Sequence, residues 1–106
     1  MVFKEGRTFS SKNLIMYARP NEIKCNRFGL SVSKKVGIAV TRNRLKRLLR
    51  EAMRKLLHEF PLKYDFVIVA RKTSVEGSLD EFMRDIKRFL LRLMYEKNSD
   101  SVHKAV

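Results

Sequence analysis

The segment from Thr41 to Leu57 reads TRNRLKRLLREAMRKLL. From Leu45 onward its apolar residues recur at spacings of three and four, which makes one stripe along a helix of 3.6 residues per turn. A helix in a protein gains most of its stability from packing such a stripe against other apolar surface. We therefore predict a helix over residues 41–57 with one side on a hydrophobic core. Pro61 ends this helical region.

The other side of this helix is strongly basic. Four of its polar residues are spaced by four, three and four positions and so share one face: Asn43, Arg47, Arg50 and Arg54. Residues 34–55 contain nine basic residues and a single acid, Glu51, for a net charge of +8. The basic residues are Lys34, Lys35, Arg42, Arg44, Lys46, Arg47, Arg50, Arg54 and Lys55. A solvated helix face usually mixes in acids, because like charges one turn apart repel. We interpret this face as a surface for the phosphates of RNA or DNA.

Asn43 allows two interpretations. It lies between Arg42 and Arg44 near the expected start of the helix, where free N–H groups and the helix dipole favour anions. Its side chain can hydrogen-bond a phosphate, a sugar or a base edge. It can equally cap the helix N-terminus.

The rest of the chain predicts a small α+β sandwich with helices packed on a sheet. With 106 residues there is room for one core. We predict strands over residues 14–18, 28–33 and 64–70, and a second helix over residues 79–96 that begins with a capping box of Ser78 and Glu81. The strand at 64–70 is almost wholly apolar, which is typical of a central strand covered on both faces. The domain spans residues 1–97, and the polar segment 98–106 is predicted to be a disordered tail.

Composition narrows the class of partner. The chain has a net charge of +13 and a pI near 10.4, which indicates a polyanion: nucleic acid or an anionic membrane. No apolar run is long enough for a membrane-spanning helix. Cys25 is the single cysteine and can form no intramolecular disulfide, so we expect a reduced, cytoplasmic protein.

We predict no catalytic residues and no metal site on the protein. His58 and His103 are far apart in the sequence, and Ser31 and Ser33 have no recognisable base nearby. The acids Asp80, Glu81 and Asp85 gather at the start of the last helix, where they favour the helix dipole. Phe28, Phe66, Phe82 and Phe89 are predicted core residues. Tyr17 is the better candidate for stacking on a base, although packing in the fold also explains it.

Two stretches together resemble a known family. The first runs from Gly29 to Gly37 and reads GLSVSKKVG; the second runs from Ala39 to Ala52 and reads AVTRNRLKRLLREA. The Arg-Asn-Arg triplet, followed by Lys-Arg and a further Arg, resembles the signature of the bacterial ribonuclease P protein subunit. The similarity continues upstream through residues 3–6 and 15–17 and downstream through residues 65–71 and the final helix, so it covers nearly the whole chain.

The resemblance implies an αβββαβα order with a left-handed βαβ crossover that places the Arg-rich helix between parallel strands. A short strand near residues 36–39 would supply the third strand. Residues 1–6 read like the last turn of a helix that closes on Gly6. Most of the family's first helix is otherwise absent here, and either a start codon assigned too late or a trimmed chain would account for it better than a real loss.

The resemblance also implies a function. Members of the family assist a catalytic RNA that removes the 5′ leader from precursor tRNA, with Mg²⁺ ions held mainly by the RNA. The RNA-binding role maps onto Lys34, Lys35, Arg42, Asn43, Arg44, Lys46, Arg47, Arg50 and Arg54. A cleft between the first helix and one sheet face holds the single-stranded leader, and the matching positions are Phe3, Ile15 and Tyr17. The implied partners are ribonuclease P RNA and precursor tRNA, with no membrane and no small-molecule substrate.

Two other classes remain to be weighed. A structural ribosomal protein or general RNA-binding protein without processing activity has the same composition. A membrane-surface amphipathic helix would need the apolar stripe that the core also needs.

Overall fold

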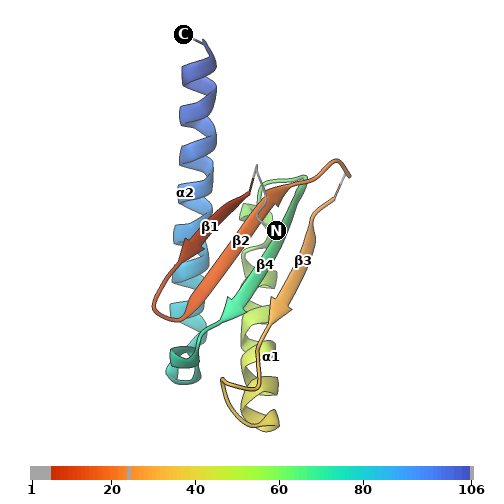
Figure 1. Ribbon diagram of the computed structural model, residues 1–106, viewed down its shortest axis with the longest axis vertical. Coiled ribbons are helices and arrows are strands. Elements are labelled where there is room, and N and C mark those ends of the chain that lie inside the picture. Colours follow the sequence, from red (N-terminus) through yellow and green to blue (C-terminus); the bar gives the residue numbers. More distant parts are fainter. Residues whose placement is uncertain (1–5, 24, 106) are drawn as a thin grey trace.

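The computed structural model describes residues 6–23 and 25–105, with side chains described as far as Tyr95 (Figure 1). The described chain forms one sheet, two α-helices and two short 3-10 helices. The strands are β1 (Arg7–Ser10), β2 (Leu14–Pro20), β3 (Arg27–Ser31) and β4 (Tyr64–Ala70). The helices are α1 (Ala39–Lys55), η1 (Leu57–Glu59), η2 (Lys72–Glu76) and α2 (Leu79–Ala105).

The sheet has the strand order β1-β2-β4-β3. β2 pairs antiparallel with both β1 and β4, whereas β3 and β4 are parallel neighbours. The chain leaves β3, rises behind the sheet through α1 and enters β4 beside β3, and this connection has the left-handed sense (Figure 1). The α+β class is thus confirmed, with βββαβα as the described part of the expected order. The helix turn expected at residues 1–6 lies almost entirely outside the described residues.

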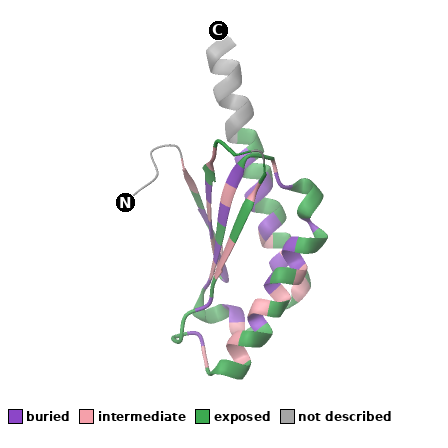
Figure 2. Ribbon diagram, turned by 90° about the vertical axis from the view of Figure 1, so that its right-hand side faces the viewer, coloured by how far each residue is buried: buried purple, intermediate pink, exposed green. Residues whose placement is uncertain are grey.

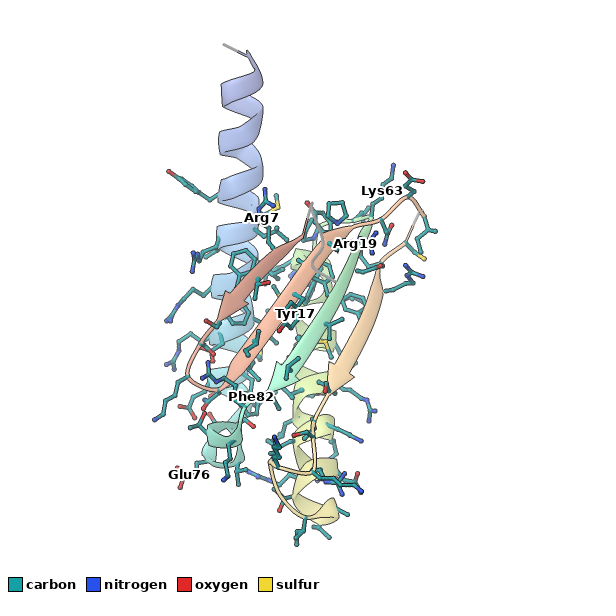
Figure 3. All side chains as sticks on the ribbon, viewed as in Figure 1. Arg7, Tyr17, Arg19, Lys63, Glu76 and Phe82 are labelled. Atoms are coloured by element: carbon teal, nitrogen blue, oxygen red, sulfur yellow. The ribbon has the colours of Figure 1, made fainter. Side chains whose placement is uncertain are left out.

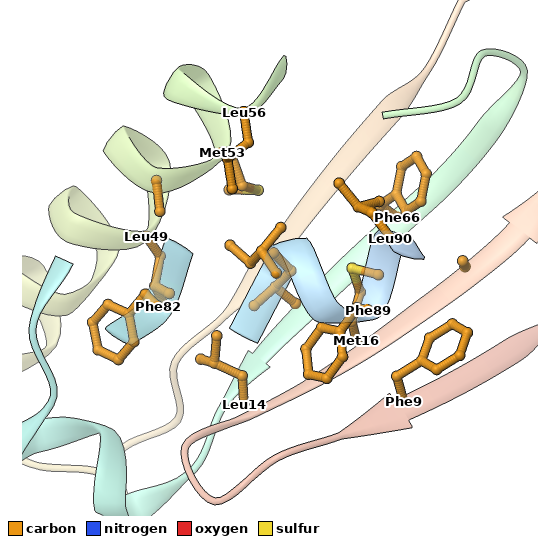
Figure 4. Packing of buried hydrophobic residues seen from close by; sticks show 14 of the residues in the cluster. Phe9, Leu14, Met16, Leu49, Met53, Leu56, Phe66, Phe82, Phe89 and Leu90 are labelled. Carbon is orange, nitrogen blue, oxygen red and sulfur yellow. The ribbon is translucent and has the colours of Figure 1, made fainter. Parts of the chain in front are cut away.

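Both α-helices lie on the same face of the sheet (Figure 2). Residues of β2 alternate accordingly, with Leu14, Met16 and Ala18 buried under the helices. The core between the two layers joins these residues to Leu45, Leu49 and Ala52 of α1 and to Phe82, Ile86 and Phe89 of α2 (Figure 4). Most of the predicted apolar stripe therefore packs in this core, whereas Leu57 lies beyond α1 and is 53% exposed.

The opposite face of the sheet carries no described helix, which corrects one expectation. β4 is central in the sheet, but the prediction that it is covered on both faces was wrong. Its burial alternates along the strand, and Val67 on the uncovered side is 37% exposed. The prediction that Phe28 belongs to the core was also only partly right. Its ring packs against those of Phe60 and Phe66 yet remains 40% exposed, because β3 is an edge strand.

Several element boundaries differ from the prediction. The third strand is β1, which pairs with β2, and no strand forms at residues 36–39. Ile38 is instead the residue at the N-cap, so α1 begins and ends two residues earlier than expected. The capping box is confirmed, since Ser78 N–H donates to Glu81 Oε1 at 3.0 Å and Glu81 N–H donates to Ser78 Oγ at 3.2 Å. The helix that follows extends past the predicted end at residue 96, into the predicted tail, as far as Ala105.

Candidate nucleic-acid interface

The side of α1 opposite the core presents a row of exposed side chains, which we call the α1 ridge: Asn43, Arg47, Arg50 and Arg54. The spacing predicted this face, and the structure confirms that all its members are exposed. Asn43 does not cap the helix, because the N-cap residue is Ile38 and Asn43 lies inside the second turn. Its amide is therefore free of that structural task and faces solvent.

The arginines of α1 differ in their partners. Arg54 makes a two-point contact with Glu51, with Nη2 at 2.7 Å from Oε2 and Nε at 3.2 Å from Oε1. This contact holds the pKa of Glu51 below its usual value, so Glu51 stays ionised at neutral pH. Arg47 and Arg50 form no ion pair within the described part of the chain. Their positive charges are thus uncompensated by any described carboxylate.

The remaining predicted cations surround the start of α1. Arg42 Nε donates to the carbonyl of Gly37 at 3.1 Å, and Arg44 Nη1 donates to that of Val75 at 3.4 Å. These bonds to neutral carbonyls orient the guanidinium groups and leave their charge intact. Lys34 and Lys35 are exposed in the loop before α1, and Lys46 is half-buried on the helix. The predicted basic residues thus form one continuous stretch from this loop along α1.

The uncovered face of the sheet, which we call the open face, is built from alternate strand residues in matched rows. One row places Thr8, Tyr17, Val67 and Gly29 side by side, and the next places Ser10, Ile15, Val69 and Ser31. Tyr17 lies at the middle of this face (Figure 3). Gly29, Ser10 and Ser31 have small side chains or none, so the surface of the sheet is shallow near the apolar residues at its centre. The open face therefore brings Ile15 and Tyr17 together as predicted, whereas Phe3 lies outside the described residues.

A charged group that the sequence analysis missed closes one end of the open face. Arg27 donates from Nε and Nη2 to Asp65 at 2.9 and 2.7 Å, and Asn21 Nδ2 donates to Asp65 Oδ1 at 2.9 Å. These bonds lower the pKa of Asp65 to about 2. The residues line a pocket of about 410 Å³ together with Arg19. The lone acid at the start of an otherwise apolar strand was the available sequence signal.

The described residues offer neither a metal site nor a membrane-spanning helix. They contain no group of three acidic, histidine or cysteine side chains placed to hold a metal ion. None of their helices has the length and apolar character needed to cross a membrane. His58 lies 3.7 Å from Glu59, and Cys25 is an exposed free thiol.

Comparison with known proteins gives consistent matches. The family model described as Ribonuclease P matches residues 1–94. The ribonuclease P protein component of Clostridioides difficile strain 630 is 40% identical over 92 residues, which cover 86% of this chain and 81% of that protein. The corresponding protein of Oceanobacillus iheyensis is 41% identical over 96 residues, covering 90% of this chain and 76% of that protein.

Solved structures agree with these matches. The RNase P protein from Thermotoga maritima superposes with a TM-score of 0.74 at 28% identity, covering 84% of each chain. The RNase P protein of Staphylococcus aureus superposes with a TM-score of 0.69 at 29% identity, covering 86% of this chain and 83% of that one.

Proposed function

The chain belongs to the ribonuclease P family, and we propose that it is the protein component that binds the catalytic RNA through α1 and the 5′ leader of precursor tRNA through the open face. The α1 ridge is the observation that supports this most directly, because Arg47 and Arg50 stand exposed on a helix and form no ion pair with a described carboxylate, while Glu51 is paired with Arg54 and Lys55. The family match favours this function over that of a structural ribosomal or general RNA-binding protein.

We propose that the α1 ridge binds the sugar–phosphate backbone of the catalytic RNA. Each phosphate contact releases condensed counterions, so binding weakens steeply as salt rises. Arginine suits this role because its planar guanidinium can contact two phosphate oxygens at once. The proposed contacts are Lys34, Lys35, Arg42, Asn43, Arg44, Lys46, Arg47, Arg50 and Arg54. Arg54 is the member whose charge Glu51 already compensates in part.

We propose that the open face receives the single-stranded leader. Tyr17 offers an aromatic ring at the centre of the face, and Ile15 lies two residues before it on the same side of β2. Unpaired bases bind proteins by stacking on such rings, because every base has a flat π surface. Gly29, which lies beyond Val67 in the same row, and Ser10 and Ser31 in the next row give a base room to approach the sheet. Phe3 would belong to the same cleft by its position in the sequence.

In this proposal the RNA carries out the chemistry. Mg²⁺ ions held mainly by the RNA would activate the attacking water and stabilise the leaving oxygen during phosphodiester hydrolysis. The protein would reduce the repulsion between two polyanions and grip the leader, so its contribution is to position and to neutralise charge. We assign it to the cytoplasm, where precursor tRNA is made in bacteria.

Reconstitution tests the proposal directly. Adding the protein to a bacterial ribonuclease P RNA is expected to increase precursor-tRNA cleavage most strongly at low magnesium, because added cationic side chains then replace counterions. Cleavage rates are measured over a magnesium series with and without protein. If the protein gives no gain at any magnesium concentration, the proposed function is wrong.

Replacing Tyr17 with alanine is expected to weaken the preference for leader-bearing substrate. Loss of one base–aromatic stack costs about 1–3 kcal/mol, or roughly fivefold to a hundredfold in affinity for precursor tRNA. The measurement compares the affinities of the reconstituted enzyme for precursor and mature tRNA. Tyr17→Phe is the matched control and should keep the preference, since it keeps the ring. Equal losses for both tRNAs would contradict the assignment of Tyr17.

A further inference from the structure

The outer side of α2 carries a second exposed row that the function above leaves without a role. Its members are spaced by four, three and four residues, the same pattern as the α1 ridge, and we call them the α2 stripe: Arg84, Arg88, Leu91 and Tyr95. The stripe lies on the side of α2 away from the buried residues Phe82, Ile86 and Phe89. Leu91 is 71% exposed and Tyr95 is 73% exposed, and neither belongs to the hydrophobic core.

The two arginines of the α2 stripe, Arg84 and Arg88, form no ion pair in the described part of the chain. Asp85, which lies between them in sequence, accepts a hydrogen bond from Ser11 Oγ at 2.9 Å and so turns toward β1. Of the neighbouring cations, Lys87 lies 3.9 Å from Glu59, and Arg92 lies over the ring of Phe9 at 5.3 Å. The stripe therefore presents two exposed guanidinium groups that no described carboxylate pairs with.

The place of α2 in the fold indicates whether the stripe would contact the catalytic RNA or the leader of precursor tRNA. α2 packs beside α1, and both helices lie on the face of the sheet opposite Tyr17 (Figure 2). An RNA that lies on the α1 ridge is therefore close to α2, whereas a leader on the open face is separated from α2 by the sheet. Two arginines followed along the helix by an exposed aromatic ring suit RNA, because the arginines can bind phosphates and the ring can stack on a base.

We propose that the α2 stripe is a second binding site for the catalytic RNA, in which Arg84 and Arg88 contact phosphates while Leu91 and Tyr95 pack against an unpaired base. The proposal rests on the proposed function, since it assumes that the α1 ridge faces the same RNA. In this proposal, α1 and α2 together form one surface for the catalytic RNA.

The test measures binding of ribonuclease P RNA to variants of the full chain over a salt series. Arg84→Gln and Arg88→Gln should each weaken binding roughly fivefold near 0.1 M salt and reduce the salt slope by about one counterion. Tyr95→Ala should weaken binding without changing the slope, because it removes stacking and no charge, and Tyr95→Phe should restore it. Lys12→Gln is the matched control, as it removes one exposed charge at the turn between β1 and β2. Circular dichroism confirms that each variant is folded.

The outcomes separate this proposal from the function it rests on. If Arg47→Ala weakens binding while both α2 arginine variants behave like Lys12→Gln, the α2 site is overturned and the α1 assignment stands. If Arg47→Ala also has no effect, the proposed RNA contact of α1 fails as well. Should the α2 variants lose affinity only for precursor tRNA, or should the stripe bind an acidic protein and leave RNA binding unchanged, the proposal is again overturned.

Discussion

Replacing Arg47 and Arg50 together with alanine is expected to weaken binding of the catalytic RNA roughly fifty-fold near 0.1 M salt. Both guanidinium groups are exposed and have no described carboxylate partner. Each phosphate contact contributes a salt slope of about 0.9, so each contact is worth nearly a factor of ten at that salt concentration. The double variant should therefore also reduce the salt slope by about two. Filter binding or fluorescence titration over a salt series measures both quantities.

Two neighbouring substitutions serve as controls for this result. Arg54→Ala should have a clearly smaller effect, because the charge of Arg54 is already engaged by Glu51 at 2.7 Å. Glu51→Gln should act in the opposite direction and strengthen binding, since it removes the one acid of α1 and releases Arg54. An unchanged salt slope in the double variant would remove Arg47 and Arg50 from the interface.

Replacing Leu49 with alanine is expected to lower the free energy of unfolding by about 2–5 kcal/mol. Leu49 is fully buried and extends from α1 into the same part of the core as Phe82 of α2 (Figure 4). The loss is a large share of the roughly 5–15 kcal/mol that stabilises a typical domain. Because Leu49 belongs to the core that joins α1, α2 and the sheet, the melting temperature should fall by roughly 10 °C or more. Thermal unfolding followed by circular dichroism provides the measurement.

Leu62→Ala is the matched control for this second result. Leu62 is 72% exposed, so the same truncation there should change the free energy of unfolding by less than about 0.5 kcal/mol. Equal melting temperatures for the two variants would mean that α1 is not anchored through Leu49. RNA affinity measured well below the melting transition should be nearly normal for the Leu49 variant, since the α1 ridge itself is unaltered.

The elements that the sequence predicted well are those with long periodic patterns. The apolar stripe of α1 spans several turns, and β4 is a seven-residue run whose bounds match the prediction. β1 escaped notice because its four residues include one buried side chain, Phe9, and no period can be read from so short a segment. The expectation of a strand at residues 36–39 failed for a related reason. Val36 is buried, but it is buried in a loop that leads directly into α1.

The candidate site also has a part that the sequence predicted and a part that it did not. The α1 ridge could be predicted because helical spacing alone determines which residues share a face. All four residues of the ridge are exposed in the structure. Only the family resemblance placed Ile15 and Tyr17 on one sheet face, because alternation along a strand does not tell which of its two faces the helices cover. The contact between Arg27 and Asp65 joins residues 38 positions apart in the sequence. Only the parallel pairing of β3 with β4 brings them together.

The alternation along β2 has a practical consequence for engineering this protein. Odd-numbered residues such as Ile15 and Tyr17 belong to the open face, while even-numbered ones such as Leu14 and Met16 hold the helices. Under the proposed function, a library restricted to the odd positions is expected to alter substrate choice and to leave assembly with the RNA subunit unchanged. Selection can therefore adjust the two properties separately within a single seven-residue strand.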